Sequence, residues 1–111
     1  DNRYFELKLK YFFELDRDQS RPLVVWGAGR NGKDVIKVLK KYEEEIHWVC
    51  DNERKIGKEI LGHQMHHFSS IESLSRPQIM VVIAAPSAKS EIENHFTRWG
   101  KKPVEDFWFF A

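Results

Sequence analysis

Three scarcities in this sequence narrow the functions open to it. A single cysteine, Cys50, rules out an internal disulfide and is typical of a reducing compartment. No apolar run approaches the roughly 18 residues of a membrane span, and no secretory signal pattern is visible. Lys and Arg number 18 against 17 Asp and Glu, so the basic excess of a nucleic-acid-binding protein is missing. We expect a cytoplasmic protein whose partners include neither nucleic acid nor a membrane.

The length and composition are those of one globular domain. The chain has 111 residues, 41% of them hydrophobic. It opens at Asp1 inside a helical pattern and closes on the aromatic stretch "DFWFFA". We therefore expect a piece of a larger protein, with residues 1–21 as a helical linker from an upstream domain and 22–111 as the folded domain.

Strand and helix patterns alternate along the chain. A lead-in helix is expected over 3–16, and we assign its apolar face to Tyr4, Leu7 or Lys8, Tyr11, Phe12 and Leu15. Segment 51–70 reads as a loop with short extended pieces. Apolar runs predict strands over 23–26, 46–50, 78–85 and 105–110, and helical patterns cover 30–44, 70–75 (capped by Ser69 or Ser70) and 86–99.

This alternation predicts an α/β fold with parallel strands and right-handed crossovers. We expect a Rossmann-like three-layer arrangement with strand order 2-1-3-4, where strand 1 is 23–26, preceded by one N-terminal helix. The ligand crevice of such a sheet lies at the carboxyl ends of the strands, where the chain switches direction between strands 1 and 3.

Three glycines follow the first strand at the spacing G-x-G-x-x-G. Gly27 suits a tight turn, Gly29 lets a pyrophosphate approach bare backbone, and Gly32 lets the helix pack close to the sheet. The free N–H groups of the helix start would face the phosphate. The alternative is that the glycines remain as a structural turn in a fold that has lost its ligand.

An acidic residue, Asp51, ends the second strand about twenty residues further on. Its carboxylate suits ribose hydroxyls and would repel a 2′-phosphate, so NAD fits better than NADP. The strand-to-helix connection at 84–87 faces the same crevice. The expected ligand-binding residues are Gly27, Ala28, Gly29, Arg30, Asn31, Gly32, Asp51, Asn52, Ala84, Ala85, Pro86 and Ser87.

The remaining reactive residue types do not form a convincing site. His63, His66 and His67 lie in a loop-like segment without nearby cysteines or paired carboxylates, so we expect no metal and leave their role open. Cys50 has two interpretations: a reactive thiol near the site, or a buried strand cysteine, which is the commoner case. No acid, base or nucleophile set is recognisable, and we expect no catalytic residue.

The stretches "VVWGAGRNGKDVIKVLKK", "IHWVCDN", "KIGKEILGHQM" and "EDFWFF" together resemble the Rossmann-like domain at the C-terminus of some bacterial family 2 glycosyltransferases. They are also similar to the N-terminal nucleotide-sugar domain of bacterial sugar acetyltransferases and to sugar-nucleotide dehydratases. The resemblance covers about 22–111. It implies that Gly27, Gly29 and Gly32 form the phosphate loop and that Asp51 and Asn52 form the ribose or base edge.

Three functions follow from these patterns. The first is a non-catalytic domain that binds a nucleotide or nucleotide-sugar; the resemblance implies that it is attached to the catalytic domain of a glycosyltransferase in surface polysaccharide synthesis. The second is an NAD-dependent oxidoreductase or a sugar-nucleotide-modifying domain. The third is a structural or oligomerisation domain with a vestigial site, for which the aromatic end could form a homodimer.

Overall fold

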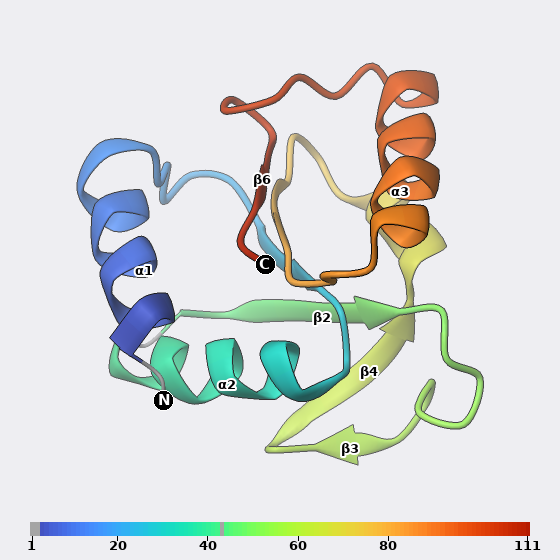
Figure 1. Ribbon diagram of the computed structural model, residues 1–111, viewed down its shortest axis with the longest axis horizontal. Coiled ribbons are helices and arrows are strands. Elements are labelled where there is room, and N and C mark those ends of the chain that lie inside the picture. Colours follow the sequence, from blue (N-terminus) through green and yellow to red (C-terminus); the bar gives the residue numbers. More distant parts are fainter. Residues whose placement is uncertain (1–2, 43) are drawn as a thin grey trace.

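A six-stranded sheet forms the centre of the computed structural model, which describes residues 3–42 and 44–111 (Figure 1). The strand order is β3-β4-β2-β1-β5-β6, and the β3–β4 pair is antiparallel whereas the other pairs are parallel. The strands are β1 (Leu23–Trp26), β2 (Ile46–Cys50), β3 (Glu59–Ile60), β4 (His63–His67), β5 (Gln78–Val81) and β6 (Phe107–Phe109). The helices are α1 (Arg3–Leu15), α2 (Arg30–Leu39), α3 (Pro86–Arg98) and the 3-10 turns η1 (Lys40–Tyr42) and η2 (Phe68–Ser73).

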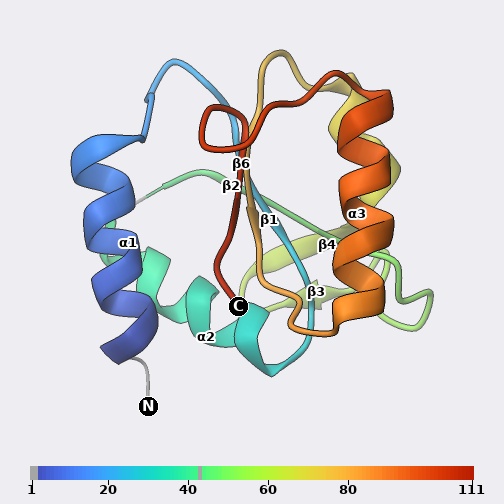
Figure 2. The same ribbon diagram turned by 45° about the horizontal axis from the view of Figure 1, so that its top comes forward.

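Helices cover both faces of the sheet. Figure 2 shows α1 and α2 on one side and α3 on the other. The four residues of β1 are all buried, and alternate side chains enter two separate apolar cores: Leu23 and Val25 pack with α1 and α2, while Val24 and Trp26 pack with α3 and η2. The predicted three-layer α/β fold is confirmed, and the order 2-1-3-4 is present as β2-β1-β5-β6.

Two strands extend the sheet beyond the predicted four. The short extended pieces expected within 51–70 are β3 and β4, which form a hairpin beside β2; their pairing with the sheet was not predicted. In β4 only Met65 is buried, and the polar neighbours on both sides of it hide the usual apolar signal of a strand. The short helix begins at Phe68 rather than at 70, and it is the side chain of His67, not Ser69 or Ser70, that caps it.

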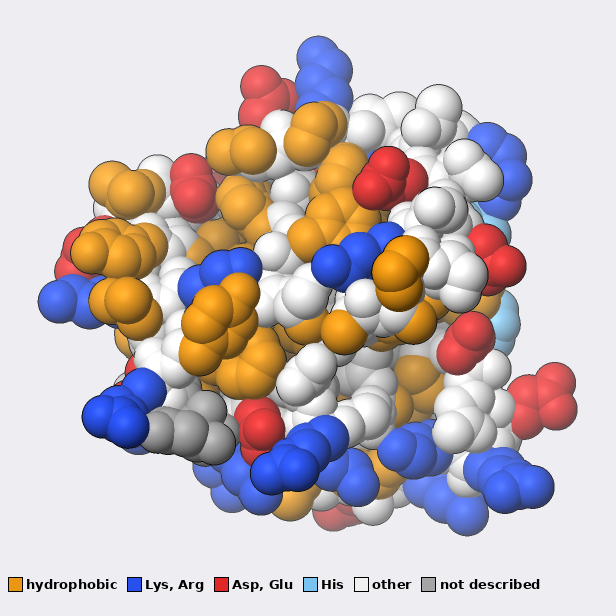
Figure 3. Space-filling model, in the orientation of Figure 1, with side chains coloured by type: hydrophobic (Ala, Val, Ile, Leu, Met, Phe, Trp, Pro, Cys, Tyr) orange, Lys and Arg blue, Asp and Glu red, His pale blue; other side chains and the backbone are white. Residues whose placement is uncertain are grey.

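Helix α1 buries a face that shares only Phe12 with the predicted one. Phe5, Leu9 and Phe12 enter the core that α2 shares, and this i, i+4, i+7 set has the spacing of one helix face. Of the predicted face, Phe12 is buried as expected, whereas Tyr4, Leu7, Tyr11 and Leu15 are all more than half exposed. Apolar residues therefore stand on two sides of α1, and spacing alone could not choose between them. Figure 3 shows apolar side chains gathered over α1.

Element ends also differ from the predictions. The helix expected over 30–44 changes to the 3-10 turn η1 after Leu39, and its predicted end includes residue 43, which lies outside the described residues, as do residues 1 and 2 of the predicted linker. The last two strands are shorter than expected, covering 78–81 and 107–109. The proposed division of the chain at residue 22 stays a prediction.

Two arginines brace the amino ends of the strands. Arg21 donates to the carbonyl oxygens of Arg76 (2.6 Å) and Pro77 (3.0 Å), and pairs with the Asp106 carboxylate at 2.7 Å. Arg17 pairs with Glu44 at 2.8 Å and donates to the Gln78 side chain at 2.9 Å. These bonds hold β1, β5 and β6 together at the end of the sheet opposite the predicted ligand site.

Candidate functional site

A cleft opens at the carboxyl edge of the sheet, where β1, β2 and β5 end. After β1 the chain crosses to α2 on one face, and after β5 it crosses to α3 on the other, so the two connections diverge and leave a hollow between them. Its volume is about 440 Å³. We call it the glycine cleft; it is lined by Gly27, Ala28, Gly29, Arg30, Asn31, Cys50, Asp51, Asn52, Lys55, Val82, Ile83, Ala84 and Ala85.

Two of the three motif glycines are required by the fold itself. Gly27 has φ +135°, a conformation that favours glycine, and a Cβ there would lie 2.8 Å from Val82. A Cβ on Gly32 would lie 2.0 Å from the Gly27 carbonyl oxygen, because α2 starts directly against the turn. The predicted roles of Gly27 in the turn and of Gly32 in close packing are thus matched by the geometry.

Gly29 is different, because nothing in the fold requires a glycine there. Its φ is −79°, which any residue adopts, and an added Cβ would meet no atom within 4 Å. The open space at this position belongs to the glycine cleft. Gly29 is also the N-cap of α2 and provides no side-chain cap, so the first N–H groups of the helix are left for water or a ligand.

The second wall of the cleft comes from the turn after β2. Asp51 is exposed there and lines the cleft. Asn52 also lines it, but its side-chain oxygen accepts from the N–H of Arg54 at 3.0 Å, and its carbonyl accepts from the N–H groups of Lys55 and Ile56. Asn52 therefore shapes this turn, whereas the carboxylate of Asp51 is placed to accept from hydroxyl groups.

Lys55 reaches from this turn across the cleft. Its ammonium donates to the carbonyl oxygen of Ala28, in the middle of the glycine loop, at 2.6 Å. Sequence reasoning missed Lys55, because one lysine in a polar loop has no periodic or motif signal. Arg30, exposed at the start of α2, is the second cation of the cleft.

The third wall follows β5. Val82 and Ile83 line the cleft together with the predicted Ala84 and Ala85; the first two were missed because β5 was expected to end at 85 and it ends at Val81. Ala85 is the N-cap of α3, and Pro86 is its first residue. Among the predicted site residues, Gly32, Pro86 and Ser87 do not line the cleft.

Cys50 lies in the cleft wall as a buried residue. Its thiol is directed to the Asn52 carbonyl at 3.8 Å. Burial raises the pKa of Cys50, and the neighbouring Asp51 carboxylate raises it further. A thiol held protonated is a poor nucleophile, which favours the interpretation of Cys50 as a packed strand residue.

A smaller hollow of about 50 Å³ adjoins the cleft on the α3 side of the sheet and shares Asp51 and Ile83 with it. Aromatic rings form its walls: Phe68 stacks on Trp26 at 4.9 Å and lies 4.9 Å from His95. Burial lowers the pKa of His95, and the charge of Arg98 lowers it further, so this imidazole is neutral near pH 7. This hollow therefore combines aromatic walls with the carboxylates of Asp51 and Glu91.

The other histidines have local roles or none that the structure defines. The Nδ1 of His67 accepts from the N–H of Ser69 at 3.1 Å at the start of η2. Within residues 3–42 and 44–111, no three His, Cys, Asp or Glu side chains come together as a metal site. None of the helices in this part of the chain is long and apolar enough to cross a bilayer.

Solved structures of two proteins have folds similar to that of this chain. The chain aligns with UDP-D-quinovosamine 4-dehydrogenase from Vibrio fischeri with a TM-score of 0.58 and 16% identity, over 74% of each chain. It aligns with RSP, a Rex-family repressor, with a TM-score of 0.64 and 16% identity, over 96% of this chain and 53% of that one. It also aligns with RSP in complex with β-NADH, with a TM-score of 0.63 and 17% identity, over 95% of this chain and 52% of that one.

These likenesses show a Rossmann-like fold. The identities are low, and the chain spans about half the length of the RSP chains. No family model matches the sequence, and no curated protein matches it either. None of the three structures adds support for the resemblance to glycosyltransferases, which stays a prediction.

Proposed function

We propose that this chain is a nucleotide-binding domain that holds the diphosphate of an NAD-like or sugar nucleotide in the glycine cleft. The observation that carries the proposal is the space beside Gly29. A vestigial turn would need glycine only at Gly27 and Gly32, where the backbone demands it, yet a Cβ added at Gly29 would meet no atom within 4 Å. A phosphate against that bare backbone accounts for the third glycine.

The charges around Gly29 fit an anion. The uncapped start of α2 carries partial positive charge, and Arg30 and Lys55 add two cations to the same cleft. Asp51 stands on the opposite wall, where it would accept from ribose hydroxyls and repel a 2′-phosphate. The arrangement favours a nucleoside diphosphate with free ribose hydroxyls.

NAD(H) and UDP-sugars share this chemistry, and each has a precedent among similar folds. One of the aligned RSP structures is a complex with β-NADH, and the aligned Vibrio fischeri enzyme is a UDP-sugar dehydrogenase. The cleft supplies cations, backbone amides and one exposed carboxylate, but no paired acid and base. Binding without chemistry is therefore the function that this geometry supports best.

Isothermal titration of the chain with NADH, UDP-N-acetylglucosamine, ADP and NADPH tests the proposal. We expect binding of at least one of the first three and weaker binding of NADPH than of NADH. Gly29→Val should abolish binding while the thermal midpoint stays near that of the original protein. Ser87→Val is a matched control, because it adds the same side chain at the start of α3, outside the cleft. No binding at millimolar concentrations would leave only the scaffold function.

The NAD-dependent oxidoreductase is the second candidate, since a similar fold holds β-NADH. It predicts a substrate-dependent change in NADH absorbance, for example with UDP-sugars as substrates. On the sequence resemblance, we further propose that the domain is attached to a glycosyltransferase. An upstream coding sequence that contains an acidic metal-binding motif would support this context, and its absence would contradict it.

A further inference from the structure

The turn that presents Lys55 is fixed by the backbone around it. The N–H groups of Lys55 and Ile56 donate to the Asn52 carbonyl at 2.9 and 3.1 Å, and the N–H of Gly57 donates to Met65 in β4 at 2.8 Å. Ile56 packs against the core on the α1 and α2 side. The backbone of Lys55 is therefore held in place by the sheet, and a side chain at a binding site needs such a rigid support.

The Lys55 ammonium occupies an unusual position for a lysine. It is partly buried in the cleft, where it donates to the Ala28 carbonyl at 2.6 Å. In the described residues no carboxylate lies within ion-pair distance of it, whereas Lys41, on the surface, pairs with Glu6 at 3.0 Å. An ammonium has three N–H donors, so the Ala28 bond leaves two for other acceptors in the cleft.

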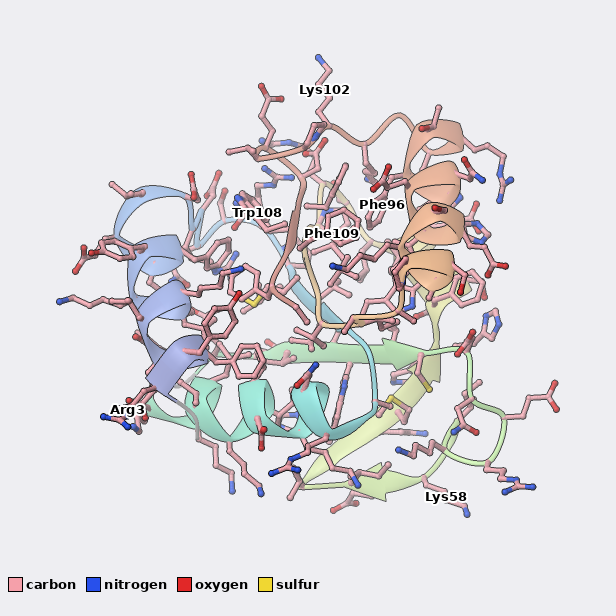
Figure 4. The ribbon with its side chains drawn as sticks, viewed as in Figure 1. Arg3, Lys58, Phe96, Lys102, Trp108 and Phe109 are labelled. Atoms are coloured by element: carbon pink, nitrogen blue, oxygen red, sulfur yellow. The ribbon has the colours of Figure 1, made fainter. Side chains whose placement is uncertain are left out.

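Lys58, in the same turn, differs from Lys55 in where its side chain lies. Three residues further on, its side chain is exposed and points away from the sheet (Figure 4). Lys58 does not line the cleft. The turn thus directs one lysine inward over the glycine loop and the other into solvent.

We infer that Lys55 is the side chain that binds the diphosphate oxygens and completes the anion site opened by Gly29 and the start of α2. The inference rests on the proposed function and deepens it, because it names a residue outside the glycine motif. A cation held in a partly desolvated cleft interacts more strongly with a diphosphate than a surface lysine does. Lys55 also ties the turn after β2 to the glycine loop, so both walls contact the same part of the ligand.

Two neutral variants and one matched control test this role. Lys55→Met removes the charge and keeps the length of the side chain, Lys55→Gln keeps a donor for Ala28, and Lys58→Met removes a charge from the same turn. Each is titrated with ADP and UDP and with the nucleosides adenosine and uridine. We expect both Lys55 variants to weaken diphosphate binding about tenfold or more, with the nucleosides unchanged. Lys58→Met should stay within about twofold of the original protein for every compound.

The outcomes distinguish a failure of the Lys55 role from a failure of the proposed function. If the original protein binds a diphosphate and the Lys55 variants bind it equally well, the role of Lys55 is wrong and the proposed function stands. If the variants lose nucleoside and diphosphate binding equally, Lys55 only supports the glycine loop, which also overturns the inference. If the original protein binds no diphosphate, the proposed function itself fails. A weaker salt dependence of binding in Lys55→Gln would add direct evidence for a phosphate contact.

Discussion

Trp48 and Gly27 are joined by a buried hydrogen bond: the indole Nε1 of Trp48 donates to the Gly27 carbonyl at 2.7 Å. Trp48 lies in the middle of β2 and is fully buried. The first glycine of the loop is thereby held from inside the core, and its N–H is held as well, by the Val49 carbonyl at 2.9 Å. The shape of the glycine cleft thus depends on the interior of the sheet and not only on its own turn.

Trp48→Phe should destabilise the fold by about 2 kcal/mol or more, because it leaves a buried carbonyl without its donor and removes buried volume. Urea unfolding measures the change. Trp108→Phe is the matched control, since the buried Nε1 of Trp108 has no acceptor among the described residues. Its cost should stay below about 1 kcal/mol. Equal losses for the two variants would mean that the bond to Gly27 contributes nothing.

Replacement by alanine should reduce the stability of the fold far more at Gly32 than at Gly29. Gly32→Ala should cost about 3 kcal/mol, because the new Cβ would lie 2.0 Å from the Gly27 oxygen. Gly29→Ala should change the stability by no more than about 1 kcal/mol, because the stiffer unfolded chain partly offsets the poorer N-cap that Ala provides. Thermal unfolding of both proteins checks the pair. A large loss for Gly29→Ala would show that Gly29 is structural after all.

The pair between Arg21 and Asp106 should make the stability of the fold depend on pH in acid. Burial on its own raises the pKa of Asp106, but the Lys102 N–H and the Arg21 guanidinium outweigh it and hold this pKa below its ordinary value. The carboxylate therefore contributes its full stabilisation above about pH 4, and this is lost as the pH falls through the lowered pKa. Asp106→Asn should flatten the acid limb of the stability curve. If the acid limb is unchanged in Asp106→Asn, the loss of stability in acid comes from other carboxylates.

Cys50 should be protected from alkylation in the folded protein. Its side chain is buried and burial raises its pKa, so little thiolate is exposed near pH 7. Iodoacetamide should label the native protein at least tenfold more slowly than the urea-unfolded protein, as followed by intact mass. Labelling at similar rates would point instead to a reactive thiol at the cleft.

The sequence predicted those parts of the fold in which buried residues form a clear apolar pattern. Continuous apolar runs located β1, β2 and β5, and the glycine spacing located the crevice between them. It failed where burial is sparse or two-sided: Met65 is the only buried residue of β4, and α1 carries apolar residues on both its core face and its solvent face. Lys55 could not be found either, because its role comes from a turn that the β4 pairing positions.

The most direct test of the central claim is to locate the bound nucleotide by NMR. In a titration of the ¹⁵N-labelled protein with NADH, ADP and UDP-N-acetylglucosamine, the account predicts that the largest amide shifts fall on 27–32 and 51–55. Gly29→Val should remove them without altering the rest of the spectrum. Shifts concentrated elsewhere, for example along the exposed face of α1, or no shifts with any of the three at millimolar concentration, would contradict it.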